Sequence, residues 1–264
     1  ADARSSAERG HAAHRDAGPF RPFSAVAGVS SARADAGGSG IAASAGSGAS
    51  PPGLPRGALV AERDTPVALV RALLGIQDDI ARGLAGALEA QDMLLARIES
   101  IFTAAEPRTW ADRRNARSLA IYALSGGAPA VVRSVLETGT LHPTVEPVAR
   151  GALAYLEGRH DAAQRLLGTR DPRSMPASLA GPLALARSAL AVQRDPDEAL
   201  GMLGYARVVA PGTLVEEAAL RRAVFVLGEL GRTDAFERLA ARYVARFRHS
   251  VYAGDFRDRL RAAV

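Results

Sequence analysis

The sequence predicts an all-α protein in which antiparallel helical hairpins stack into an α-solenoid, preceded by a disordered N-terminal segment. Three observations favour this class. Apolar residues recur at helical spacing through most of the chain after residue 65, no segment alternates apolar and polar residues as a half-buried strand would, and glycine or proline interrupts the periodic segments at short intervals. Because short connections join antiparallel neighbours, the helices should pair as hairpins.

Residues 1–56 form the predicted disordered segment. They consist mainly of Ala, Gly, Ser and Pro and contain one leucine, Leu54. A segment with so few large apolar side chains cannot bury enough surface to offset the entropy that its backbone loses on folding. We therefore predict two regions, a disordered segment at 1–56 and a helical-hairpin repeat domain at 57–264. His11 and His14 make at most a weak metal site, and we interpret both as solvated.

The first predicted helix covers about 66–83, because Thr65 supplies an N-cap, Pro66 suits the first helical position and apolar residues then recur at helical spacing. Similar periodicity predicts ten further helices. They are expected near 86–105, 113–125, 128–138, 145–157, 160–168, 178–193, 196–209, 213–230, 233–247 and 253–263. Trp110, before the third helix, is expected to anchor two hairpins rather than to bind a ligand.

Three of the predicted hairpins share a spacing of 36 residues. The coinciding positions are Ala163, Ala199 and Ala235 and, one turn later, Leu167, Leu203 and Leu239. Alanine lets two helices approach closely, and leucine fills the space between hairpins. With Ala206 and Pro211 following in the middle unit, the pattern resembles the second helix of a tetratricopeptide repeat, although the period is longer and the first-helix Trp and Leu-Gly positions are missing. Such tetratricopeptide-like stacks present grooves to partner proteins, which favours a binding function.

The composition excludes several classes of function. The chain of 264 residues has no cysteine, which rules out disulfides, thiolate zinc sites and cysteine catalysis. It has no apolar run long enough for a transmembrane helix. The net charge is +5 and every basic residue is arginine, but the arginines mostly alternate with carboxylates, as on solvated helix faces. We therefore predict no nucleic-acid partner, because a nucleic-acid surface needs a basic stripe with little acid in it.

No motif for chemistry is recognisable in the sequence. It lacks a phosphate-binding glycine loop, a nucleophile elbow and a paired-histidine zinc motif, and His142, His160 and His249 are far apart in the predicted folded region. We predict no catalytic, cofactor-binding or metal-binding residue, and a protein that is not an enzyme. An enzyme would need a cleft with converging acids, for which the sequence offers only Glu216 and Glu217.

Two groups of residues are candidates for partner binding. Glu216 and Glu217 precede Arg221 and Arg222, and they either grip a basic partner or, as we favour, make an i,i+4 ion pair on an exposed helix. Near the C-terminus arginines alternate with aromatic residues, which either form an exposed surface or lie in the core. The arginines are Arg242, Arg246, Arg248, Arg257 and Arg259, and the aromatic residues are Tyr243, Phe247, Tyr252 and Phe256. The predicted partner-binding residues are Glu216, Glu217, Arg221, Arg222, Arg248, His249 and Tyr252.

Six blocks of sequence, taken in order, carry a family resemblance. They are LVR…IQDDIARG (69–83), WADRRNAR (110–117), YALSGG (122–127), GALAYLEGR (151–159), APGTLVEEAALRR (210–222) and RFRHSVYAGDF (246–256). Together they resemble the MotC family, periplasmic motility proteins of rhizobia and related alphaproteobacteria. The resemblance covers about 66–264.

The resemblance implies a non-enzymatic accessory of the flagellar motor that acts with the periplasmic part of the stator protein MotB. It carries no catalytic or cofactor-binding residue over to this chain, and members of the family are longer. The resemblance implies a periplasmic location, and because the sequence begins Ala1-Asp2-Ala3 without Met, we expect a signal peptide to have been removed or to lie outside it. The alternative is a general tetratricopeptide-like adaptor unrelated to motility, and the sequence leaves the oligomeric state open.

Overall fold

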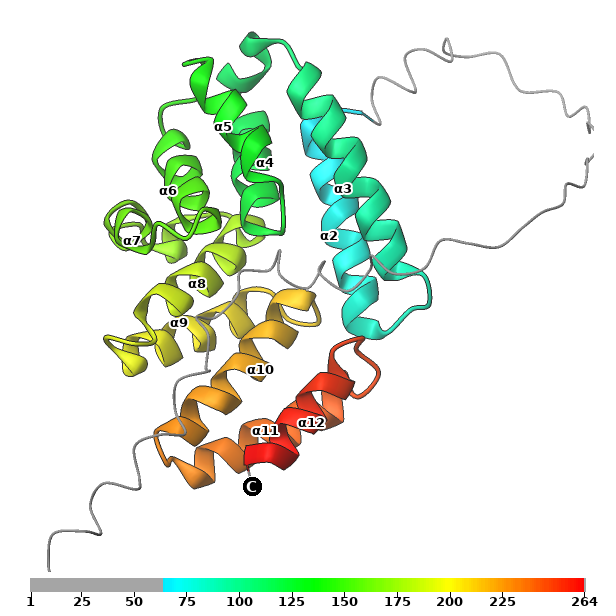
Figure 1. Ribbon diagram of the computed structural model, residues 1–264, viewed down its shortest axis with the longest axis vertical. Helices are drawn as coiled ribbons and strands as arrows, with labels where there is room; N and C mark the ends of the chain where they lie inside the picture. The colour runs from blue at the N-terminus through cyan, green and yellow to red at the C-terminus, as the bar shows by residue number, and fades with distance from the viewer. Residues whose placement is uncertain (1–63, 264) are drawn as a thin grey trace, which may run out of the picture.

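The computed structural model describes residues 64–263, and this part of the chain is entirely helical (Figure 1). The α-helices are α2 (Pro66–Arg82), α3 (Ala87–Ala104), α4 (Arg113–Leu124), α5 (Pro129–Glu137), α6 (Glu146–Leu156), α7 (His160–Leu167), α8 (Ala177–Ala191), α9 (Pro196–Val209), α10 (Leu214–Glu229), α11 (Thr233–Phe247) and α12 (Ala253–Ala263). The predicted all-α class is confirmed. The segment predicted to be disordered at 1–56, with His11 and His14, lies outside the described residues.

The predicted helix ends lie within two residues of the observed ones, and local capping accounts for several of them. Thr65 Oγ1 accepts a hydrogen bond from the backbone N–H of Ala68 at the start of α2. Asp112 caps α4 by accepting from two backbone N–H groups, and Asp195 caps α9 in the same way with one. Two short 3₁₀ helices, η2 (Pro107–Ala111) and η3 (Pro172–Ser174), were not predicted, because a single turn leaves no periodic pattern in the sequence.

Consecutive helices pair as antiparallel hairpins, and the first helix of each later hairpin lies in the interior. Helices α8 and α10 bury residues on all sides, because α8 packs against α9, α4, α7 and α10, and α10 packs against α11, α9, α2 and α8. The second helices, such as α7 and α11, bury only one stripe. Trp110 is 1% exposed and its ring meets the edge of Phe102, so it is a core residue as predicted.

The repeat positions lie where the sequence placed them, in the second helices of three hairpins. Ala163 and Ala199 are completely buried, and the leucines one turn later in α7 and α9 are also buried. The equivalent residues of α11, Ala235 and Leu239, are only half-buried. In the described residues no further hairpin of this kind stacks beyond α11, so the last repeat keeps one partly open side.

The hairpin array curls round until its first hairpin meets its last helices, and we call this contact the seam. Figure 1 shows α12 and its preceding turn lying at the end of α2. The N–H of Val251 donates to the carbonyl oxygen of Ile80 at 3.2 Å, and the N–H of Leu214 donates to the carboxylate of Asp78 at 3.4 Å. One apolar cluster joins Ile80 to aromatic residues of α11 and α12. The seam therefore fixes the curvature of the stack.

Candidate partner-binding surface

The acidic and basic residues of α10 lie inside the protein. Glu216 is 6% exposed, Glu217 is fully buried and Arg222 is 9% exposed. The expectation that this helix is exposed is wrong, because α9, α11, α8 and α2 all pack against α10. These three side chains consequently offer little surface to a partner.

Glu217 is the centre of a buried polar network. Its Oε1 atom accepts from Arg221 Nε at 3.1 Å and from the Tyr243 hydroxyl at 2.6 Å, while Oε2 accepts from Arg221 Nη2 at 3.2 Å. The predicted i,i+4 pair is thus present, but in the core rather than in solvent. Arg221 also lies over the ring of Tyr252, with its guanidinium carbon 5.0 Å from the ring centroid. The network ties α10 to α11 and to the residues before α12.

Arg222 belongs to a different part of the interior, because successive residues of a helix point about 100° apart. Its Nη1 donates to the carbonyl oxygen of Leu185 in α8 at 3.3 Å. Burial lowers the pKa of Arg222 and raises the pKa of Tyr155 in α6, while the attraction between the two groups opposes both shifts. Arg221 and Arg222, adjacent in sequence, therefore serve two separate contacts.

The two tyrosines near Glu217 predict a loss of stability in alkali. Burial raises the pKa of Tyr252 to about 12, and burial followed by the charge of Glu217 raises that of Tyr243 above its ordinary value. Tyrosines of the unfolded chain lose their protons near pH 10, whereas these two keep theirs to a higher pH in the folded protein. Their contribution to the free energy of unfolding is therefore fully present below pH 10 and is lost as the pH rises from about 10 towards 12. In this range the free energy of unfolding should fall by up to about 1.4 kcal/mol per pH unit for each tyrosine.

Urea unfolding between about pH 9 and about pH 11.5, with tyrosinate absorbance followed in parallel, measures this dependence. The Tyr252→Phe variant is the control, because one of the tyrosines with a raised pKa is then gone and the fall of the free energy of unfolding with pH should be shallower. A free energy of unfolding that stays constant over this range would contradict the prediction.

The aromatic residues of the C-terminal cluster are core, and the arginines between them are exposed. Tyr243 and Phe256 are nearly inaccessible and their rings lie 3.9 Å apart, centroid to centroid. Arg248 and His249, at the end of α11, remain exposed, and Arg248 Nε donates to His249 Nε2 at 2.9 Å. Of the predicted partner-binding residues, these two are exposed in the described structure, and their role in binding stays a prediction.

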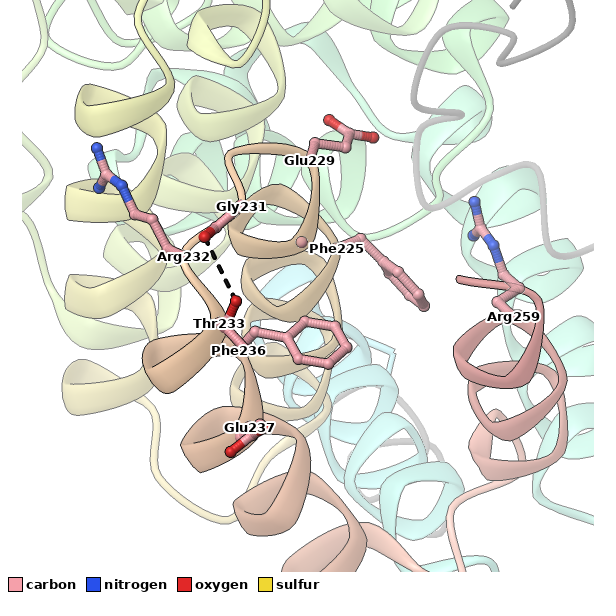
Figure 2. A pocket seen from close by; sticks show the side chains of 9 residues that line it. Phe225, Glu229, Gly231, Arg232, Thr233, Phe236, Glu237 and Arg259 are labelled. Atoms are coloured by element: carbon pink, nitrogen blue, oxygen red, sulfur yellow. Dashed lines mark hydrogen bonds between the residues drawn. The ribbon is translucent and has the colours of Figure 1, made fainter. Parts of the chain in front are cut away.

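A cavity of about 550 Å³ opens between the end of α10, the start of α11 and α12 (Figure 2). Phe225 and Phe236 supply its apolar wall, and the guanidinium of Arg259 lies 4.9 Å from the centroid of the Phe225 ring. Glu229 and Glu237 lie on its rim. Arg259 was predicted as part of the C-terminal cluster, but the cavity was not predicted, because its lining comes from three helices and no local motif marks it.

Within residues 64–263, no group of three or more His, Asp or Glu side chains is arranged to hold a metal ion. In the same part of the chain, no helix has the length and apolar character that crossing a membrane requires.

Comparison with known proteins identifies the family. A family model described as "Chemotaxis protein MotC" matches residues 16–264. A curated relative, "Chemotaxis protein MotC" of Rhizobium meliloti (strain 1021), is 31% identical over 197 residues, which cover 75% of this chain and 45% of the relative. The chain thus spans less than half the length of that relative, and no solved structure matches it. The match to the family model over most of the sequence shows that the chain belongs to the MotC family.

Proposed function

We propose that this protein is a non-enzymatic accessory of the flagellar motor that acts in the periplasm and supports motility and chemotaxis. The observation that carries the proposal is the match to the MotC family model over residues 16–264. The relative from Rhizobium meliloti, named as a chemotaxis protein, supports it. The partner is the periplasmic part of the stator protein MotB.

The helical stack suits a binding role. The second helices of the later hairpins each leave one side exposed, and stacks of helical hairpins commonly bind partner proteins on such a surface. The seam holds these helices in a fixed arrangement, so that a partner meets a preorganised surface and less free energy is lost in ordering that surface. Arg248 and His249, at the seam, are proposed contact residues. The buried network of Glu217, Arg221 and Tyr252 acts on binding indirectly, because it holds α10 against α11 and against the turn before α12.

A binding measurement with the purified periplasmic region of MotB tests the partner. We expect a complex with the full-length protein in a pull-down and in calorimetry, and recovery no greater than on empty resin would contradict the proposal. Fractionation of the source cells should place the protein with periplasmic markers. A deletion strain should lose swimming, and the intact gene should restore it.

A general adaptor of the tetratricopeptide-like type, unrelated to motility, is the second candidate. The observation that favours it is the spacing of 36 residues between the hairpins, a feature that does not depend on the family. The same deletion strain separates the two functions, because an adaptor for another process leaves swimming unchanged.

A further inference from the structure

The cavity beside the turn between α10 and α11 has an aromatic wall. Phe225 and Phe236 are only half-buried there, because each packs against the apolar cluster of α11 and α12 and also lines the cavity. A Cβ added at Gly228, which lies one turn after Phe225, would be 3.4 Å from the ring of Phe236. This glycine therefore leaves the space beside the ring empty, and a volume of about 550 Å³ has room for a large apolar side chain.

The charged side chains of this lining are unequally compensated. Arg232 donates to both carboxylate oxygens of Asp197 in α9, at 2.6 and 3.0 Å. Glu229 and Glu237 are exposed, and their carboxylates form no ion pair or hydrogen bond in the described part of the chain. Arg259 lies over an aromatic ring and has no carboxylate partner there either. The lining thus holds two unpaired carboxylates against one unpaired guanidinium, although the whole chain has a net charge of +5.

The two unpaired carboxylates lie at opposite edges of the cavity. Figure 2 shows Glu229 on one side of the Phe225 and Phe236 rings and Glu237 on the other. A single small cation would meet only one of these carboxylates. A chain that crosses the cavity can instead place one basic side chain at each edge.

We propose that this cavity binds a segment of a partner protein in which a large apolar side chain is flanked by basic residues. The apolar side chain enters the cavity and packs against Phe225 and Phe236, while the basic side chains before and after it pair with Glu229 and Glu237. In an extended segment, the side chains of alternate residues point to the same side. A basic residue two positions before the apolar residue and another two positions after it therefore face the same surface.

The inference rests on the proposed function for the identity of the partner, which is the motility partner, whereas the chemistry of the segment follows from the cavity. Contacts with an apolar interior supply affinity, and charges on the rim supply orientation and a faster encounter. A neutral or acidic segment would leave the carboxylates of Glu229 and Glu237 without a partner.

Fluorescence anisotropy with a labelled peptide of about nine residues tests the site on the full chain. The peptide carries phenylalanine at its centre, arginine two positions before and after it, and glycine or serine elsewhere. We expect saturable binding that weakens as the salt concentration rises from about 50 to about 300 mM, because salt screens exposed charges. Peptides with serine in place of the phenylalanine, or with glutamate in place of both arginines, should not bind.

Three variants of the lining test whether the peptide occupies the cavity. Glu229→Gln and Glu237→Gln should each weaken the affinity about two- to fivefold, because an exposed ion pair contributes modestly. Gly228→Leu should weaken it about tenfold or more by filling the space beside Phe236, and its melting temperature should not fall, because leucine favours a helix more than glycine does. Glu99→Gln is the matched control, since Glu99 is an exposed residue of α3 outside the lining, and it should leave the affinity unchanged.

Equal affinity of the unaltered protein and the Glu229→Gln/Glu237→Gln double variant would overturn the proposal, and so would unchanged affinity of a folded Gly228→Leu variant. The double variant is expected to fold because both residues are exposed, and its melting temperature checks this. Absence of peptide binding to the unaltered protein, or an equal loss in Glu99→Gln, would also overturn it. Tighter binding of phenethylamine than of the peptide would assign the cavity to a small ligand and overturn the choice of a protein segment.

A parallel titration with the periplasmic region of MotB separates this inference from the proposed function. Unchanged binding of that region to the double variant and to Gly228→Leu would sink the cavity as the partner site and leave the function standing. Absence of binding to the unaltered protein, together with carboxylate-dependent binding of the basic peptide, would sink the choice of partner and leave the chemistry of the cavity standing.

Discussion

Replacement of Glu217 by alanine is expected to lower the free energy of unfolding by about 3–5 kcal/mol. The side chain is fully buried and accepts three hydrogen bonds, two from Arg221 and one from Tyr243. Without it, the largely buried guanidinium of Arg221 keeps its desolvation cost and loses its counter-charge. Because small domains are stable by only about 5–15 kcal/mol, the variant should lose a large share of its stability. Urea unfolding followed by circular dichroism measures the loss.

Two further variants test whether the loss comes from the buried ion pair. Glu237→Ala removes a carboxylate from an exposed position of α11 and should change stability by no more than about 0.5 kcal/mol. The double variant Glu217→Met/Arg221→Met removes both charges together, and it should recover much of the loss, because apolar residues of similar size often replace a buried ion pair at little cost. A loss below about 1 kcal/mol for Glu217→Ala would show that water solvates Arg221 and that the network is not buried as described.

The helices of this protein were predictable because the information that defines them is local. Thr65 and Pro66 mark the start of α2, and apolar periodicity gives the approximate length of each helix. The spacing of 36 residues also identified which helices are equivalent. These features need no knowledge of the rest of the chain.

The environment of α10 was not predictable in the same way. Its charged residues suggested an exposed helix, yet Glu217 meets the hydroxyl of Tyr243, which lies 26 positions further along the chain. Glu217 can be buried because Arg221 and Tyr243 both donate hydrogen bonds to its carboxylate, whereas a carboxylate without such partners would need to stay in contact with water. Sequence spacing within one helix reveals Arg221 but not the tyrosine. The candidate site therefore required the packing of α11 before its buried and exposed residues could be separated.

The seam could not be predicted from the local sequence pattern. Gly83, the residue after α2, has a backbone φ of +76°, and its left-handed conformation ends the helix as a glycine commonly does. In sequence it is therefore an ordinary helix stop. In the structure the carbonyl group of His249 lies directly against it, so that the same glycine is also the point where the first hairpin touches the last turn.

Replacement of Gly83 by alanine is expected to open the seam and to destabilise the protein by about 2–5 kcal/mol, the sum of a conformational cost and an overpacking cost. An ideal Cβ at this position would lie 1.7 Å from the carbonyl oxygen of His249, a distance that no small adjustment relieves because the obstacle is backbone. The turn before α12 must move away, and the hydrogen bond from Val251 to Ile80 should be lost with it. Thermal unfolding and amide hydrogen exchange at Val251 measure the two effects.

Gly86→Ala separates the two causes. Gly86 has a φ of +75°, almost the same as that of Gly83, but nothing lies within 4 Å of an added Cβ. The Gly86→Ala variant should therefore show only the conformational cost of about 1–2 kcal/mol, and the amide hydrogen exchange of Val251 should be unchanged. Equal losses in the two variants would mean that His249 does not press on Gly83, and the hairpins would then form an open stack. A larger loss in Gly83→Ala, accompanied by rapid exchange at Val251, requires the closed arrangement, because only there do residues 83 and 249 meet.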